Sequence, residues 1–318
     1  MAEAQSLREA FGRALVVAGT HRPDFVVLDA DVAGGTCAAY FKQAFPSRFY
    51  DFGIAEQNMM AAAAGFAASG VTPVVTTFAV FATMRALEQL RTFVAYPRLD
   101  VKVAGSHCGL DVGPDGATAQ ALEDLAMTRA IPNLTVVVPG DAVEMAQAVD
   151  AILAHDGPVY LRTGRSPLPV LFDAGHRFVL GRAQVLEEGD DVTLVAAGTM
   201  LHRTLAAAAQ LRRGGIRARV VNCPTVKPLD VACLVESAER TGAVVTAEDH
   251  SIVGGLGGAV AEALATHCPV PMAMVGVRDC FGASGDPQEL AAHFGLTAAD
   301  VVAAARQLVR AKEARRSA

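Results

Sequence analysis

One carboxylate stands at the start of a helix made of small, apolar residues. Glu56 follows the strand-like stretch 48–51 and precedes the alanine run 61–64. This order places its side chain at a strand-to-helix turn, near the carboxyl edge of a sheet. A carboxylate buried in such apolar surroundings needs a partner, because an isolated charge is costly to bury. The alternative is a glutamate that only favours the helix dipole.

Two phenylalanines follow a second strand-like run. Phe78 and Phe81 lie in the stretch 76–87 at a spacing that places both rings on one helical face. Two such rings at the end of a strand form an apolar wall on which a flat heteroaromatic ring can stack. Packing in the protein core is the alternative interpretation of this pair.

A long loop rich in glycine, from Gly105 to Gln120, follows a third apolar run and contains His107 and Asp115. Glycines allow the backbone to approach a ligand closely. Polar loops at strand ends are where α/β proteins bind their ligands. The loop therefore predicts a binding site, although a lone histidine can also be structural.

A parallel sheet would bring these three segments together, because the carboxyl ends of its strands share one edge. Short apolar runs alternate with helical stretches along the chain, which predicts an α/β fold with two domains, each a mainly parallel sheet flanked by helices. The prolines at 167 and 169 interrupt the alternation. We predict a first domain over 1–165, a linker over 166–185 and a second domain over 186–318. The predicted strands are 25–28, 72–76, 100–104, 135–138 and 159–162, then 192–196, 218–221, 243–247 and 272–275, with a last helix from about 297.

Composition excludes several function classes. The formal net charge is −6, and no basic stripe lies outside the last helix, so we expect no nucleic-acid partner. No apolar run reaches membrane-spanning length, and the N-terminus is an amphipathic helix rather than a signal segment. The six cysteines form no CxxC pair or ligand spacing and predict reduced, mostly buried thiols without a metal. A cytoplasmic enzyme is the expectation.

The three segments resemble the transketolase family. Residues 53–57 match its Gly-Ile-Ala-Glu-Gln motif, the phenylalanine pair matches its Phe-x-x-Phe element, and the loop matches its His-containing glycine loop. The resemblance implies thiamin diphosphate as the cofactor. It also implies that the motif glutamate hydrogen-bonds the aminopyrimidine ring, so that the thiazolium carbon loses its proton. By this match the cofactor-binding residues are Glu56, which is also catalytic, together with Phe81, which stacks on the ring, and Phe78, Ile54 and Asp31.

The same resemblance implies a sugar site with altered details. It assigns substrate binding to His107, which is also a catalytic candidate, and to Asp115, Arg8 and Arg165, the arginines gripping a terminal phosphate. The second loop histidine, the phosphate-site serine and the third aromatic residue of the family are replaced here by Ala119, Gly35 and Met84. We therefore expect an unusual sugar substrate.

The resemblance covers only the pyrimidine-binding and C-terminal domains of a transketolase. Stretches 246–251 and 281–285 resemble that C-terminal domain, and the glycine cluster 254–258 is interpreted as structural. We find no Gly-Asp-Gly followed by the Mg²⁺-binding asparagine, so this chain has no predicted metal ligands. This implies the second subunit of a split transketolase, with Mg²⁺ held by an N-terminal partner subunit in an α2β2 heterotetramer.

Three functions remain open at this point. The first is ketol transfer from a ketose to an aldose. The second is another thiamin reaction, as the β subunit of a 2-oxo acid dehydrogenase or a relative of deoxyxylulose-phosphate synthase. The third is a non-catalytic regulatory subunit. Fold alone cannot separate them.

Overall fold

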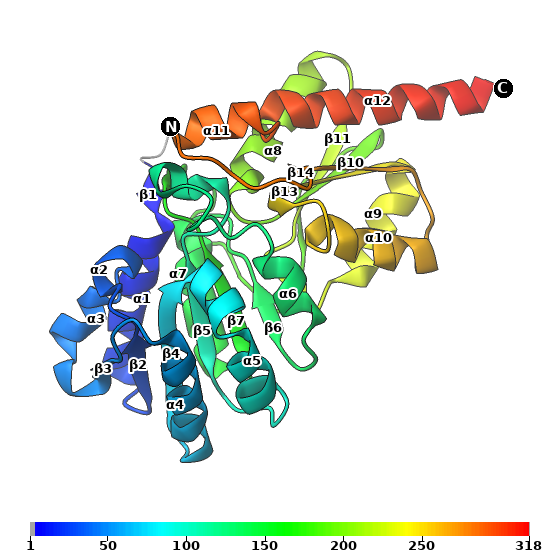
Figure 1. Cartoon of the computed structure of the whole chain (residues 1–318). Helices are drawn as coiled ribbons and strands as arrows, with labels where there is room; N and C mark the ends of the chain where they lie inside the picture. Colours follow the sequence, from blue (N-terminus) through cyan, green and yellow to red (C-terminus); the bar gives the residue numbers. More distant parts are fainter. Residues whose placement is uncertain (1–3, 318) are drawn as a thin grey trace.

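The chain forms two mainly parallel sheets, each flanked by helices, which confirms the predicted fold class (Figure 1). The computed structural model describes residues 4–317. None of the helices in this range combines the length and the apolarity that crossing a membrane requires.

The first sheet has seven strands in the order β12-β6-β7-β5-β4-β2-β3. All neighbours are parallel except β12 and β6. Its strands are β2 (Phe25–Asp29), β3 (Phe49–Asp51), β4 (Thr72–Phe78), β5 (Lys102–Ser106), β6 (Thr135–Val137), β7 (Val159–Thr163) and β12 (Thr225–Lys227).

Alternate side chains of this sheet enter two different cores. Val27 and Val74 face the core under α1 and α7, whereas Leu28 and Val75 face the core under α4, as the two-residue period of a strand requires. Both faces are covered, which explains why the strands appear in the sequence as continuous apolar runs. The helices of this half are α1 (Leu7–His21), α2 (Ala33–Thr36), α3 (Ala39–Ala44), α4 (Glu56–Ala68), α5 (Leu87–Gln89), α6 (Asp124–Ala130) and α7 (Ala142–Ala154). Short 3-10 segments span Pro46–Arg48 and Leu110–Asp115, and π-helical segments span Phe81–Arg85 and Leu90–Ala95.

The second sheet has five strands in the order β14-β13-β10-β11-β9, and only the edge strand β9 runs antiparallel to its neighbour. Helices α8 and α12 cover one face, and α9 and α10 cover the other. The strands are β9 (Gln184–Glu187), β10 (Val192–Ala196), β11 (Ala218–Asn222), β13 (Val244–Ser251) and β14 (Met272–Val277). The helices are α8 (Met200–Arg213), α9 (Val231–Thr241), α10 (Leu256–His267), α11 (Pro287–His293) and α12 (Ala298–Ser317).

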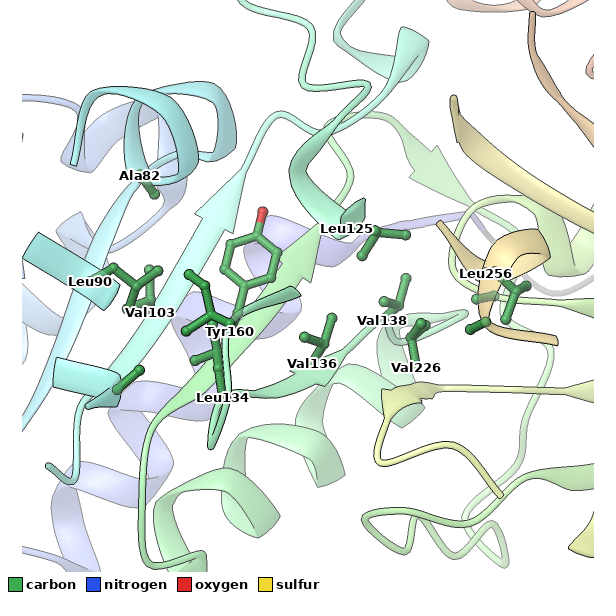
Figure 2. Close-up of a cluster of buried hydrophobic side chains, with 14 of the residues drawn as sticks. Ala82, Leu90, Val103, Leu125, Leu134, Val136, Val138, Tyr160, Val226 and Leu256 are labelled. Carbon is green, nitrogen blue, oxygen red and sulfur yellow. The ribbon is translucent and has the colours of Figure 1, made fainter. Parts of the chain in front are cut away.

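One of the hydrophobic cores, which lies under α4, is shared by the two halves. Figure 2 shows Val103 and Leu125 of the first half in the same cluster as Val226 and Leu256, which come from the second half of the chain. Strand β12 also joins the first sheet, although it lies between β11 and α9 in the sequence. The halves are therefore held together by apolar packing and by backbone pairing.

The predicted linker is fastened to the first half. The Asp141 carboxylate, which caps α7, accepts hydrogen bonds from the backbone N–H groups of Leu171 and Phe172 at 2.7 and 2.9 Å. Strand β8 (Pro167–Leu168) pairs with β1 (Gln5–Ser6). This pairing places the start of α1 beside the end of β7.

All six cysteines are free, but the prediction that they are mostly buried is only half right. Cys37, Cys108 and Cys223 are buried, whereas Cys280 is exposed on a loop of the second half.

Candidate active site

The predicted site residues gather at the carboxyl edge of the first sheet. The strand order places β7, β5, β4, β2 and β3 side by side, and a predicted site residue follows each of these strands. The residues, in that strand order, are Arg165, His107, Phe81, Asp31 and Glu56. Arg8 joins them from the first turn of α1, because the β1–β8 pairing holds that turn next to Arg165.

Glu56 begins α4, and its side chain is only 2% exposed. Its Oε1 accepts a hydrogen bond of 2.8 Å from Nη1 of Arg85. Its Oε2 is buried and has no hydrogen-bond partner among the described residues. Since a buried carboxylate oxygen without a donor is costly, this atom is suited to a ligand.

We expected a carboxylate buried here to need a partner, and the structure provides Arg85, a residue that the sequence did not single out. Arg85 lies at the end of the π-helical segment, and its guanidinium carbon is 4.2 Å from the ring centroid of Phe81. The spacing of four residues from Phe81 was the available signal, since residues at that spacing share a helical face. Arg85 therefore links the carboxylate to the aromatic wall.

The two phenylalanines do form a wall, but not on one helix. Phe78 ends strand β4, and Phe81 begins the π-helical segment, so the prediction of a shared helical face is wrong. The strand continues two residues further than the sequence indicated. The ring centroids still lie 5.7 Å apart at an interplanar angle of 15°. Phe78 also stacks on His107, with centroids 3.8 Å apart.

His107 is buried, 3% exposed, and adopts a left-handed backbone conformation with φ 60°. Its Nδ1 lies 2.9 Å from Oγ of Ser106. Burial, together with the positive charges of Arg8 and Arg165, lowers the pKa of this imidazole to about 4. The site therefore contains a neutral histidine at neutral pH.

We expect the His107 ring to titrate near pH 4, which an NMR titration of the folded chain can measure. The unfolded chain would take up this proton near pH 6.5, so the contribution of His107 to stability is full above that pH and is lost as the pH falls toward 4. The variant His107→Asn assigns the resonance and should lack this part of the acid destabilisation. A ring that titrates near 6.5 would show that the imidazole is not enclosed.

Arg8 and Arg165 lie beside each other with Asp115. Arg8 donates from Nη1 to the carbonyl of Gly35 at 2.5 Å and from Nε to the carbonyl of Arg165 at 3.2 Å. Nη1 of Arg165 donates to Oδ1 of Asp115 at 3.0 Å and to the carbonyl of Val112 at 2.5 Å. These bonds use Nε and Nη1 of Arg8 and only Nη1 of Arg165. The remaining N–H groups can bind an anion such as phosphate or sulfonate.

The residues that differ from the family motif lie in or near this site. A Cβ on Gly35 would lie 3.2 Å from Cε1 of Phe78 and 3.7 Å from Cε1 of His107, so Gly35 stands against the aromatic stack. Ala119 is buried in the glycine loop, whereas Met84 is half exposed.

The last two predicted cofactor residues are exposed. The backbone N–H of Asp31 donates to Oδ1 of Asp51, and Asp31 itself has φ 61°. Ile54 is 78% exposed and is one of the most exposed large apolar side chains in the described range.

The site fits one part of thiamin diphosphate. The unpartnered Oε2 of Glu56 and the adjoining Phe81 ring offer a hydrogen-bonding atom and a stacking surface for a pyrimidine ring. In residues 4–317 no group of three His, Cys, Asp or Glu side chains is arranged to hold a metal ion.

Comparisons with known proteins agree with this geometry. Residues 3–170 match the model of the transketolase pyrimidine-binding domain, and residues 181–301 match that of the transketolase C-terminal domain. The 6-deoxy-6-sulfo-D-fructose transketolase subunit SqwH of Clostridium sp. (strain MSTE9) is 45% identical over 91% of this chain and 90% of its own length. One of the subunits of the apulose-4-phosphate transketolase of Phocaeicola vulgatus is 35% identical over 95% of this chain and 97% of its own. A solved structure, a split gene transketolase described as an inactive beta4 tetramer, has a TM-score of 0.89 and 48% identity, and the match covers 97% of this chain and 99% of that one.

Proposed function

Because this chain belongs to the transketolase family, we propose that it is one subunit of a split transketolase that moves a two-carbon ketol unit from a ketose to an aldose. The observation that carries the proposal is the buried carboxylate of Glu56, whose Oε2 lacks a partner beside Phe81 and the stack of Phe78 on His107. One edge of the sheet therefore holds both a cofactor end, around Glu56 and Phe81, and a substrate end, around His107.

At the cofactor end, we assign to Oε2 of Glu56 the hydrogen bond to the pyrimidine ring, and to Phe81 the stacking contact. Arg85 holds Oε1 and so fixes the direction of the carboxylate. Ile54 and Asp31 complete this end from the neighbouring loops. Thiamin diphosphate, when bound, supplies a nucleophilic carbon that can cleave the bond next to a ketose carbonyl.

At the substrate end, His107 acts as a neutral hydrogen-bonding group, in keeping with its low pKa. Asp115 contacts a sugar hydroxyl, and Arg8 and Arg165 bind a terminal anionic group of the sugar. Arg165 connects these roles, because it bonds directly to Asp115.

We propose a partner subunit with the diphosphate-binding domain and the Mg²⁺ ligands, in an α2β2 assembly. The exposed Ile54 and the half-exposed Met84 give an apolar surface near Glu56 that such a partner would cover. Residues 1–165 would bind the pyrimidine ring, 166–185 would be the linker and 186–318 the C-terminal domain. A cytoplasmic location is proposed from the six free thiols.

The relatives favour ketol transfer over the other thiamin reactions. Both of the relatives named above are transketolase subunits, and each is matched over nine tenths or more of its own length. The paired and buried Glu56 supports a catalytic rather than a purely regulatory role for this chain.

We also propose an unusual sugar as the substrate. Gly35 and Ala119 remove two polar groups that the family uses to bind ketose phosphates. The two relatives are named for 6-deoxy-6-sulfofructose and apulose 4-phosphate, which supports a specialised substrate. Both compounds carry a terminal tetrahedral anion of the kind that Arg8 and Arg165 can bind.

We expect the wild-type complex to use xylulose 5-phosphate with ribose 5-phosphate poorly, and Ala119→His to raise kcat/KM for this pair about five- to ten-fold. This gain corresponds to one recovered hydrogen bond of roughly 1 kcal/mol. Steady-state kinetics with xylulose 5-phosphate, 6-deoxy-6-sulfofructose and apulose 4-phosphate as donors measures the difference.

Ala117→His is the matched control, because Ala117 lies in the same loop but is half-buried, and we expect no gain from it. If the wild-type complex has the kcat/KM of an ordinary metabolic enzyme for xylulose 5-phosphate and Ala119→His brings no gain, the protein is an ordinary pentose-phosphate transketolase subunit and the proposal of an unusual sugar is wrong.

A further inference from the structure

We propose that Asp249 of the second half is a positioning residue for sugar binding, since its carboxylate fixes the loop that carries His107 and Asp115. This inference rests on the proposed function. It gives the second half a part in substrate binding, although none of our predicted site residues lies there.

The contact is direct and buried. Asp249 lies in β13 and is 4% exposed. Its Oδ1 accepts a hydrogen bond from the backbone N–H of Leu110 at 2.9 Å, and its Oδ2 accepts one from Asp111 at 3.3 Å. The loop therefore presents two consecutive N–H groups to one carboxylate, three and four residues after His107.

Gly109 allows the Asp249 carboxylate to approach the backbone of the loop. A Cβ on this residue would lie 2.3 Å from Oδ2 of Asp249, and its φ of 69° also favours glycine. The second half touches the loop at two more glycines. A Cβ on Gly113 would lie 3.0 Å from Pro287, and one on Gly116 would lie 2.4 Å from Oγ of Ser284. The loop therefore packs closely against the second half from Gly109 to Gly116.

The hydrogen bonds of Asp249 connect to the proposed sugar site through Asp111. The carboxylate of Asp111 accepts hydrogen bonds from the backbone N–H groups of Arg165 and Ser166 at 2.6 and 2.8 Å. Arg165 in turn bonds to Asp115. Asp249 therefore fixes the one segment, Leu110–Asp111, that lies between His107 and the Arg165–Asp115 pair.

Removing the carboxylate should act locally, because other groups hold β13 in place. Arg162 is buried and donates from Nη2 to the backbone carbonyl of Asp249 at 2.9 Å. It also pairs with Asp124 at 2.8 Å, and Asp124 accepts a hydrogen bond from the hydroxyl of Tyr160 at 2.7 Å. Leu125, next to Asp124, packs in the shared core close to Tyr160 (Figure 2). None of these hydrogen bonds uses the Asp249 carboxylate, although the positive charge of Arg162 also attracts it.

The test compares Asp249→Asn with Glu248→Gln in the complex with the partner subunit. Glu248 is a matched control because it is the preceding residue, is equally buried and also accepts two backbone hydrogen bonds, from Leu256 and Gly257 at 2.6 and 2.8 Å. Those bonds lie at the start of α10 and do not touch the loop.

We expect Asp249→Asn to raise the KM of the fastest of the three donors about ten-fold or more, as loss of a hydrogen bond to a charged group predicts. The change in kcat should be small, and the concentration of thiamin diphosphate that gives half-maximal activity should stay the same. Hydrogen exchange of the backbone around Leu110 should become faster in Asp249→Asn and not in Glu248→Gln. This last readout does not depend on turnover.

An active wild-type complex in which both variants give the same KM and the same exchange would overturn this proposal while leaving the proposed function intact. A wild-type complex inactive on all three donors would overturn the proposed function and this proposal with it. If Asp249→Asn does not fold, Gly109→Ala tests the same contact from the loop, because the added Cβ would displace the Asp249 carboxylate.

Discussion

Replacement of Glu56 by glutamine is expected to slow ketol transfer in the assembled enzyme by about two to four orders of magnitude, the range for removing a positioned acid–base group. Glutamine keeps an oxygen for Arg85, so the contact at Oε1 can remain. At the position of Oε2 it offers an N–H₂ donor instead of a carboxylate oxygen. The fold should therefore survive while the cofactor loses its charged partner.

Two measurements separate these effects. NMR can follow the exchange of the proton on the reactive carbon of bound thiamin diphosphate, and steady-state kinetics gives the turnover. Glu88→Gln is the matched control, because Glu88 is an exposed carboxylate three residues after Arg85. If Glu56→Gln exchanges this proton as fast as wild type, Glu56 is not the catalytic group.

The arrangement of Glu56 agrees with our proposal that this chain supplies half of a site. One carboxylate oxygen is held by Arg85, the other has no partner within the described chain, and Ile54 next to it is exposed. A buried orphan oxygen and an exposed apolar side chain both cost free energy in an isolated chain. Both costs would be relieved when the partner subunit and the cofactor are bound.

The positions of the strands could be predicted because buried parallel strands are continuous apolar runs. The run at Val192–Ala196 matches β10 at both ends, and the run predicted from residue 72 continues two residues further, to Phe78. The last helix begins within one or two residues of its predicted start. Five of the candidate site residues at the sheet edge, Arg165, His107, Phe81, Asp31 and Glu56, follow from the same pattern, since each comes after a strand.

Contacts between distant residues could not be predicted in this way. Arg85 is 29 residues from Glu56, and Asp249 is 139 residues from Leu110, and no local pattern records either pair. Strand β12 joins the first sheet by pairing with β6, a partner that lies about 90 residues earlier in the chain. Such pairings are decided by tertiary packing, and a period of 2 or 3.6 residues carries no information on them.

Reconstitution is expected to give the largest effect of all, a change from no turnover to turnover. The isolated chain should bind thiamin diphosphate weakly and catalyse nothing, since the family's Gly-Asp-Gly and Mg²⁺-binding asparagine are missing from its sequence and Mg²⁺ normally holds such a diphosphate through oxygen ligands. Mixing it with a partner that carries the Gly-Asp-Gly element and the Mg²⁺-binding asparagine should restore binding and activity together.

Two variants of the chain test where the partner docks. Ile54→Asp places a charge on the exposed apolar surface near Glu56 and should prevent assembly. Val17→Asp is the control, because Val17 is also exposed, at 58%, but lies on α1, which covers the opposite face of the sheet from α4.

Titration calorimetry with thiamin diphosphate and Mg²⁺, on the chain alone and on the mixture, is the most direct test of a split active site. We predict weak binding by the chain alone, and tight, Mg²⁺-dependent binding by the mixture with ketol transfer in the same sample. Tight, Mg²⁺-dependent binding by the isolated chain would contradict the account, because the chain would then hold the whole cofactor site by itself.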